Sequence, residues 1–502
     1  MRERPRMTVV DDATSLNGGA IDVRARIAWI LRMARVTAHV DDNRMRTVAA
    51  AIGTSPARLS RAETGQLRDG SLVDGYERVL GLEEGSLRAP IDVLARTFPW
   101  VSPGDARPGP PISTVIELSE LTGRLDSVDD VTGGEWLRWA RAISVRGNVA
   151  LPEALAQRTI DRLVDELARS CGHGYPTRYE ALAKVRCSDY GFLVLRAARR
   201  EVARPHAQGL GDLLSAVGEA VTPDAVQWCL ELLRADRPYV ATCGALALEN
   251  MAEISPRGAF WPDVVPHLIE AYDASEPGSA QEEWIAHLIR LAPAATWTGT
   301  HHTPARPLPP VPDVEGFERH RTNRHWAQCA AIADDVTRTV GVGEQPMLAR
   351  LLFDIGFGHW ESRAVTAYFL LGAVPALAHP VWDRLGELVE AEPDQRLRHR
   401  MARRVHGALT GRIVAPALEW LDSPDPVLRG AGLQVVGSSG GLLPLDVVRR
   451  ALADPDTARA ATYAIGMSGH PALPDIAADE DLTESVRGSA RWWIERGPRV
   501  AV

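Results

Sequence analysis

The chain has 502 residues, a formal net charge of −9, 45% hydrophobic residues and 24% charged residues. This composition is ordinary for a soluble globular protein, and the length indicates about three domains at roughly 150 residues each. No apolar run approaches the roughly 18 residues that span a bilayer, and no signal peptide opens the sequence. The five cysteines are scattered and form no CxxC pair, as is typical of reduced thiols. We therefore expect a cytoplasmic protein without membrane contact.

Charge is distributed unevenly along the chain. Residues 1–90 have a balance of +2, so residues 91–502 carry −11. Attraction to phosphate is local at physiological ionic strength, so the overall acidity does not exclude DNA contact by the first segment. It does argue against the larger segment lying along nucleic acid.

The first 97 residues are predicted to form a small helical unit. Residues 1–20 are expected to be a disordered lead-in. Residues 21–35 have helical periodicity. The apolar face of that helix holds Ile27, Ile30, Leu31 and Ala34.

Two short helices with clear ends follow. "RMRTVAAAIG" predicts a helix that ends at Gly53, and "TSPARLSRAET" predicts a second helix directly after it. Ser55 suits the N-cap, Pro56 the first helical position and Gly65 the C-terminal cap. Two further short helices complete a unit of about five helices over residues 21–97.

Proline- and glycine-rich segments divide the rest of the chain. Residues 98–113 are predicted to be a linker, and residues 301–314 a second break. Helical periods dominate residues 114–300, including a helix pair over Thr222–Ile254.

Residues 315–502 contain an internal repeat. Its arginines are spaced 35, 31, 30 and 28 residues apart: Arg363, Arg398, Arg429, Arg459 and Arg487. Such spacing predicts stacked helical pairs. With "LDSPDPVLRGAGLQVVG" as the best match, these units resemble HEAT-like repeats, and residues 114–300 are expected to be HEAT-like as well. The predicted fold is therefore all-α, with a small headpiece of about five helices joined by a linker to a large HEAT-like α-solenoid.

The stretch "VAAAIGTSPARLSRAETG" resembles the Cro/phage-repressor type of helix-turn-helix domain, the XRE family. Gly53 matches the turn of the motif and Leu59 its buried position. Val48 and Ala49 match the packing of the first motif helix, and "S-R-x-E-x-G" from Ser60 to Gly65 matches the closing pattern.

The resemblance implies that the second motif helix enters the major groove of double-stranded DNA. Arg61 is then the candidate for a bidentate guanine contact, and Arg58 for a base or a phosphate. Ala57 could contact a thymine methyl group, and the amides near Ser55 suit a phosphate. The implied DNA-contacting residues are Arg44, Arg46, Thr47, Ser55, Pro56, Ala57, Arg58, Ser60 and Arg61.

The sequence also departs from the family pattern. Met45 stands where a glutamine is common, and Pro56 and Ala57 stand where some relatives read bases with glutamines. The connection over residues 36–43 is longer than usual and carries two aspartates. Glu63 is expected to be structural and to pair with an arginine of the first helix such as Arg35.

No catalytic residues, metal ligands or cofactor are expected. "CGHGYPTRYE" offers a cysteine and a histidine but no second ligand pair at zinc spacing. The leading hypothesis is a DNA-binding transcriptional regulator, not an enzyme, whose repeats serve dimerisation, effector sensing or protein binding. The alternative is a protein-interaction scaffold whose helix-turn-helix no longer reads DNA. An enzyme within residues 114–300 is the weakest hypothesis.

Overall fold

The computed structural model describes residues 9–16, 20–40, 42–98, 114–127, 130–145, 151–255, 259–297, 303–310, 323–407 and 413–500. Within these ranges the protein is all-α, as predicted, with 27 helices, no strand and one isolated bridge between Ser170 and Val500. No helix in the described ranges is long and apolar enough to cross a membrane. Most of the predicted linker, residues 99–113, lies outside them.

The N-terminal helices are α1 (Val23–Thr37), α2 (Met45–Ile52), α3 (Pro56–Glu63), α4 (Gly70–Leu80) and α5 (Arg88–Thr97). They are followed by α6 (Val115–Leu125), α7 (Gly133–Ile143), α8 (Glu153–Leu167), α9 (Gly174–Arg186), α10 (Gly191–Ala203), α11 (Leu210–Val217), α12 (Pro223–Leu232), α13 (Pro238–Ile254), α14 (Trp261–Ala274), α15 (Ala280–Leu291) and α16 (Ala294–Trp297). The last are α17 (Arg324–Val340), α18 (Pro346–Phe357), α19 (Glu361–Gly372), α20 (Pro375–Ala391), α21 (Gln395–Gly407), α22 (Ala415–Trp420), α23 (Pro426–Ser439), α24 (Leu445–Ala453), α25 (Ala458–Ser468), α26 (Leu473–Ala478) and α27 (Glu484–Arg496).

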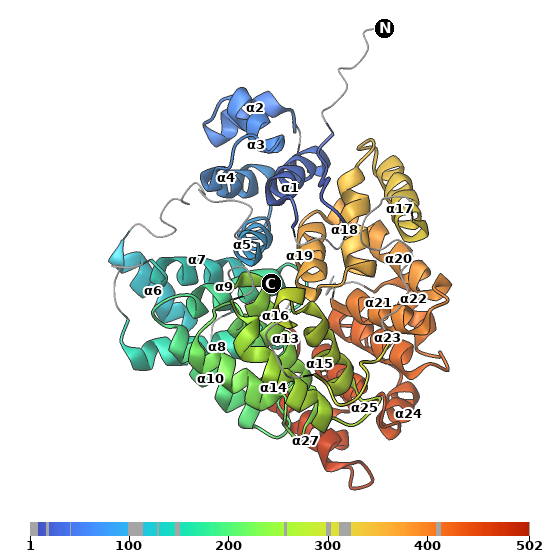
Figure 1. The fold of residues 1–502 in the computed structure, drawn as a ribbon. Helices are drawn as coiled ribbons and strands as arrows, with labels where there is room; N and C mark the ends of the chain where they lie inside the picture. Colours follow the sequence, from blue (N-terminus) through green and yellow to red (C-terminus); the bar gives the residue numbers. More distant parts are fainter. Residues whose placement is uncertain are drawn as a thin grey trace.

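Alternate helices pack against one another in two series. In the first, α7, α9, α11, α13 and α15 follow in order, and each also contacts the helix before it. In the second, α21, α23, α25 and α27 do the same with α20, α22, α24 and α26. Figure 1 shows the first series in cyan to yellow-green and the second in orange to red. An amphipathic helix pair buries its apolar face only against neighbours, which explains this order.

The five repeat arginines lie in the first turns of alternate helices α19, α21, α23, α25 and α27, as their spacing predicts. Their partners nevertheless differ. Arg429 pairs at 2.6 Å with Asp454, the residue that follows α24. Arg487 instead pairs at 3.0 Å with Glu484 of its own helix. The Arg459 guanidinium lies over the Tyr239 ring of α13. The arginines therefore occupy equivalent helices, but their side chains do not form the same contact in each repeat.

Helix α1 is buried almost all round, not on one face only. Its Arg26 is fully buried and lies between the carboxylates of Asp12, at 2.8 Å, and Asp354 of α18, at 2.6 Å. Trp29 is also fully buried and donates to Gln345 Oε1 at 3.1 Å. Arg26 and Trp29 thus connect α1 to α18 and to the residue before it, while α1 also packs against α3 and α4.

The expectation of disorder over residues 1–20 is wrong for residues 9–16. Val10, Asp12 and Leu16 are buried, and Arg350 of α18 donates to the carbonyls of Thr14, at 2.6 Å, and Ser15, at 3.2 Å. These contacts need partners more than 300 residues away, so no local pattern could indicate them. Residues 1–8 and 17–19 lie outside the described part of the chain.

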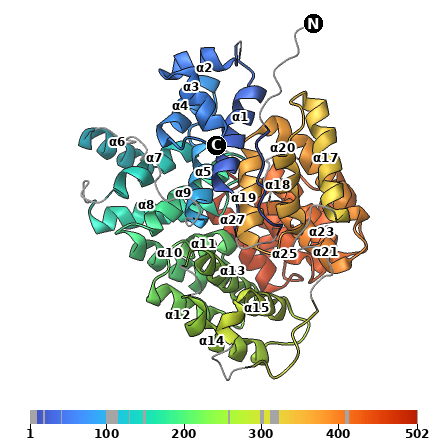
Figure 2. The same ribbon diagram turned by 45° about the horizontal axis from the view of Figure 1, so that its top comes forward.

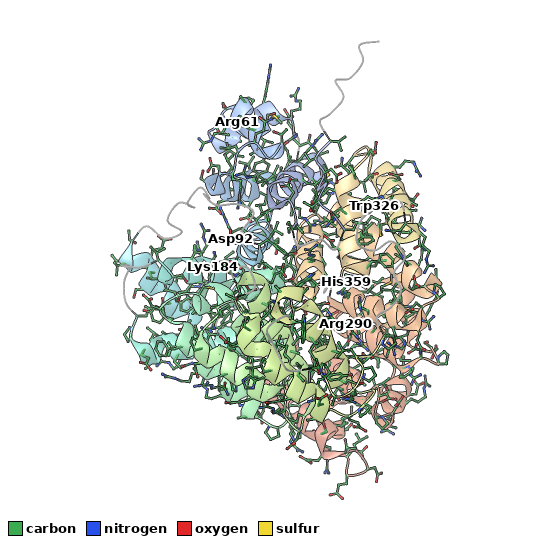
Figure 3. All side chains as sticks on the ribbon, viewed as in Figure 1. Arg61, Asp92, Lys184, Arg290, Trp326 and His359 are labelled. Atoms are coloured by element: carbon green, nitrogen blue, oxygen red, sulfur yellow. The ribbon has the colours of Figure 1, made fainter. Side chains whose placement is uncertain are left out.

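Helix α5 is embedded among helices of the larger region. It packs against α9, α13 and α19, and Figure 2 shows it beside α9 and α19. Arg96 pairs with Glu180 at 2.6 Å and with Glu219 at 2.8 Å. Asp92 pairs at 3.0 Å with Lys184, and Figure 3 labels both residues. The N-terminal helices therefore share a core with the rest of the protein.

The described part of the second proline-rich break, residues 303–310, lies on α14 and α15. Arg306 donates to the carbonyls of Tyr272 and Ser275, and the Tyr272 hydroxyl donates to the Pro307 carbonyl at 2.8 Å. This segment is not helical, but hydrogen bonds join it to the helices beneath it.

Replacing Asp354 tests the buried ion cluster. Asp354→Asn leaves Arg26 and Arg350 with one fewer carboxylate in a site without water access, so we expect a loss of about 3–5 kcal/mol in the free energy of unfolding. The control Asp335→Asn removes an exposed partner of Arg384 and should cost at most about 1 kcal/mol. Urea denaturation of both variants provides the measurement. Equal effects would contradict a structural role for the cluster.

Candidate nucleic-acid interface

The segment α2–turn–α3 has the ends that the sequence predicts. Gly53 has φ +83°, and the Thr54 amide donates to the Ala49 carbonyl at 2.9 Å, which closes the end of α2. Ser55 Oγ accepts a hydrogen bond from the Arg58 amide at 3.2 Å, and Pro56 occupies the first turn of α3. Gly65 follows α3 with φ +74°. The left-handed backbone at Gly53 makes the connection between α2 and α3 short, so these two helices pack directly.

The inner faces of these helices are apolar. Leu59 and Ala62 of α3 and Val48 and Ala49 of α2 are buried against α1 and α4. Burying the whole Leu59 side chain contributes about 1.5–3 kcal/mol, which helps to hold α3 against the other helices. The opposite face of α3 is left at the surface.

Glu63 is buried at the end of α3 and pairs with Arg35 of α1, as the sequence predicts. The Arg35 Nε lies 2.6 Å from Glu63 Oε1, and Nη2 lies 2.7 Å from Oε2. The Tyr76 hydroxyl of α4 donates to the same carboxylate at 2.7 Å. One carboxylate thus connects α3 to α1 and α4, and it is not free to contact a ligand.

The implied DNA-contacting residues lie together at one end of the molecule. Figure 3 places Arg61 at this end, on α3. All nine come from α2, α3 and the residues just before them. Eight are exposed and Ser60 is half-buried: Arg44, Arg46, Thr47, Ser55, Pro56, Ala57, Arg58, Ser60 and Arg61.

Two aspartates already engage three of these residues. Asp42 accepts hydrogen bonds from Arg44 Nη2 at 2.6 Å and from Thr47 Oγ1 at 2.7 Å, and these bonds lower the pKa of its carboxyl. Asp69, the N-cap of α4, pairs with Arg58. Although burial alone would raise it, hydrogen bonds from Ser71 and Arg58 lower the pKa of Asp69.

Arg46 and Arg61 differ from these residues. Both side chains are exposed, and neither forms an ion pair or a hydrogen bond with another described residue. They are therefore the cations of this surface that can bind an anion without first breaking an internal pair. The sequence signalled Asp42 as a departure from the family pattern, but it contained no local sign of the Arg58–Asp69 pair.

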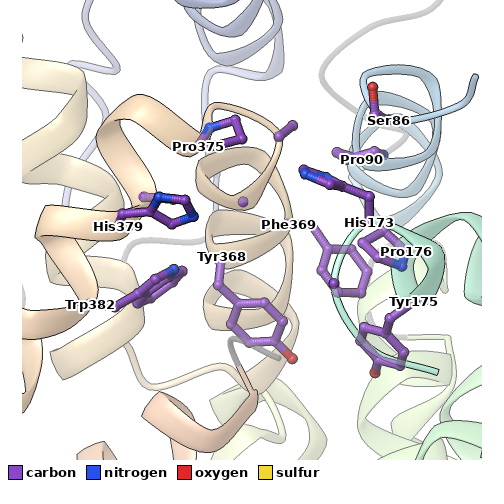
Figure 4. Close-up of a pocket in the computed structure, with 14 residues that line it drawn as sticks. Ser86, Pro90, His173, Tyr175, Pro176, Tyr368, Phe369, Pro375, His379 and Trp382 are labelled. Carbon is purple, nitrogen blue, oxygen red and sulfur yellow. The ribbon is translucent and has the colours of Figure 1, made fainter. Parts of the chain in front are cut away.

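A second feature is a narrow cleft where α5 meets α9, α19 and α20. Figure 4 shows His379 and Trp382 on one side and His173 and Pro90 on the other. Its volume of about 50 Å³ is far below the roughly 300–1,000 Å³ of small-molecule sites. In this conformation the cleft has room for a few water molecules only.

Tyr175, which lines this cleft, donates to a carboxyl group behind it. Its hydroxyl lies 2.6 Å from Asp212 Oδ1 of α11. Burial raises the pKa of Asp212 to about 6, against the opposing effect of the Tyr175 hydrogen bond. Asp212 thus changes charge close to neutral pH.

Comparison with known proteins assigns no family. The sequence matches no protein-family model, and no curated protein matches it. The resemblance to the XRE type of helix-turn-helix therefore depends on the residues of this chain alone.

Glu63→Gln tests how α3 is held. The amide keeps the shape but loses the charge opposite Arg35, so we expect a loss of about 2–3 kcal/mol in the free energy of unfolding. The control Glu283→Gln changes an acidic residue in the first turn of α15 and should alter stability little. Denaturation curves of the two variants decide the outcome, and unchanged stability of Glu63→Gln would show that the pair is dispensable.

Asp212→Asn tests the titration behind the cleft. A folded-state pKa raised to about 6 means that this group's contribution to stability is fully present below about pH 4 and is lost as the pH rises through 6. The asparagine does not titrate and still accepts from Tyr175. Relative to the wild type, Asp212→Asn should therefore gain about 1–3 kcal/mol between pH 4 and pH 8. A stability difference that does not vary with pH in denaturation experiments would refute this assignment.

Proposed function

We propose that this protein is a DNA-binding transcriptional regulator. In this proposal α1–α5 form a helix-turn-helix headpiece of the XRE type, and α3 enters the major groove of double-stranded DNA. The observation that carries the proposal is the α2–Gly53–α3 unit, which buries Leu59 and leaves Arg61 exposed and unpaired among the described residues. A major groove about 12 Å wide accepts such a helix.

Arg61 and Arg46 have different roles in this proposal. Arg61 lies on the outer face of α3, where a guanidinium can donate two hydrogen bonds to guanine. Arg46 lies in the first turn of α2, where helix-turn-helix proteins contact the DNA backbone. Arg58 can join the contact once DNA phosphate competes with Asp69 for its guanidinium.

The larger part of the chain, α6–α27, acts as a HEAT-like α-solenoid in this proposal. It serves dimerisation, effector sensing or protein binding. The two series of alternately packed helices support this role, since stacked helix pairs present extended surfaces. A cytoplasmic location is consistent with the five unpaired cysteines.

The second candidate is a protein-interaction scaffold that has lost DNA reading. The specific observation in its favour is that Asp42 and Asp69 engage Arg44, Thr47 and Arg58. These pairs reduce the positive charge available to phosphate. In vitro selection from random duplex DNA with the full chain separates the candidates: an enriched sequence supports the regulator, and no enrichment supports the scaffold.

Substitution of the two free arginines then tests their roles. Arg61→Ala should lose about 1–3 kcal/mol at the selected sequence and relax the preference at one base position. Arg46→Ala should weaken binding to all DNA sequences equally and reduce the slope of log K against log salt by about one unit. The control Arg338→Ala changes an exposed residue of α17 and should bind as the wild type does. Equal, sequence-independent losses for Arg61→Ala and Arg46→Ala in gel-shift titrations would reject base reading by Arg61.

A further inference from the structure

A cavity lies between the N-terminal helices and the larger region. Its volume is about 410 Å³, and its walls come from α4, the α4–α5 loop, α5 and α7. We call it the α4–α7 cavity. Its size falls within the range of roughly 300–1,000 Å³ that small-molecule sites occupy.

Close packing makes the two walls of this cavity one unit. Gly85, in the α4–α5 loop, has φ +87°, and a Cβ there would lie 2.8 Å from Thr177 Cγ2. A Cβ on Gly134 of α7 would lie 2.6 Å from the Glu84 carbonyl oxygen. Because both positions lack side chains, the loop lies directly on α7 and α9. A ligand in the cavity would therefore contact α4 and α7 at the same time.

Four arginines and three acidic residues line the cavity. Two of the carboxylates have hydrogen-bond partners, and the third has only a distant arginine. Glu77 accepts hydrogen bonds from three backbone amides, at 2.7–3.0 Å. Asp74 is shared between Arg88, at 2.8 Å, and Arg141, at 3.4 Å. The Glu84 carboxylate lies 3.7 Å from Arg138, which is beyond hydrogen-bond distance.

Two guanidinium groups consequently have donors to spare. Arg78 is exposed and pairs with no other described residue. Arg138 Nε, the atom that faces Glu84 at 3.7 Å, is buried without a hydrogen-bond partner in the described part of the chain. A buried unpaired donor on a charged group is unfavourable unless a ligand satisfies it. Planar guanidinium groups match phosphate and carboxylate oxygens in pairs of parallel hydrogen bonds.

We propose that the α4–α7 cavity binds a small molecule that carries phosphate or carboxylate groups, held by Arg78 and Arg138. The binding step stands apart from DNA. A second step rests on the proposed function: a ligand that contacts α4 and α7 together stabilises the packing of the headpiece on the larger region and thereby changes DNA affinity. Coupling of this kind acts equally in both directions, so DNA would change the affinity for the anion by the same factor.

Calorimetric titration of the full chain with pyrophosphate and, separately, with citrate tests the binding step. The ionic strength is held constant so that general screening does not vary. We expect saturable binding of at least one anion at one site. Pyrophosphate alone assigns a phosphorylated ligand and citrate alone a carboxylate ligand, and both outcomes support the proposal. No saturable binding of either anion up to millimolar concentration overturns it.

Matched variants identify the site. Arg138→Ala should lower the affinity for the anion about tenfold or more, because a charge-assisted pair of hydrogen bonds is lost. Arg138→Lys should recover part of that loss. Arg196→Ala removes an exposed arginine of α10 and should bind as the wild type does. Equal affinities of the Arg138→Ala and Arg196→Ala proteins overturn the site.

The same variants distinguish the small-molecule site from a DNA-phosphate surface and from the regulator proposal. Arg138→Ala could weaken binding to all duplex DNA and leave pyrophosphate and citrate binding unchanged. In that case the cavity arginines belong to a DNA-phosphate surface, and the small-molecule site is rejected. Because the calorimetry contains no DNA, failure of the regulator proposal leaves the binding result intact. Conversely, a chain that selects a DNA sequence but binds neither anion refutes only the effector site.

Discussion

Arg26 is fully buried between Asp12 and Asp354, and this contact holds α1, the helix against which α3, α4 and α5 pack. Removing a guanidinium from water is expensive unless carboxylates surround it with good geometry. Although burial alone would raise it, the charges of Arg26 and Arg350 hold the pKa of Asp12 well below its ordinary value. The three partners come from the N-terminal segment, α1 and α18. The ion cluster therefore joins the first residues of the chain to its second half.

A continuous set of contacts runs from this cluster to the exposed end of the molecule. Helix α1 holds Arg26 on one side and Arg35 on the other, and Arg35 binds Glu63 of α3. The orientation of α3 is therefore determined by α18 through one helix. In the regulator proposed above, the larger region would therefore position α3, and the headpiece would not swing on a linker.

Charge at the exposed end is finely balanced. Asp42 and Asp69 neutralise arginines of the candidate interface, while Arg46 and Arg61 keep their charges free of internal partners among the described residues. Exposed pairs of this kind are weak, and salt or a phosphate competes with them easily. The internal pairs therefore reduce nonspecific attraction to DNA more than they prevent a close contact. Under the regulator proposal, this balance suits sequence reading better than general DNA packing.

The sequence by itself determined the features that depend on near neighbours. Helical periods and the caps at Gly53, Ser55 and Gly65 followed from local spacing and from a motif of eighteen residues. The resemblance to the helix-turn-helix motif also led us to expect that Glu63 pairs with an arginine of the first helix, such as Arg35. Only the tertiary structure decided that Arg26 is buried, that residues 9–16 are ordered and that α5 lies within the larger region. The physical reason is distance along the chain. Arg26 meets Asp354 across 328 positions, and a charged residue on a helix looks solvent-exposed until its distant partner is known.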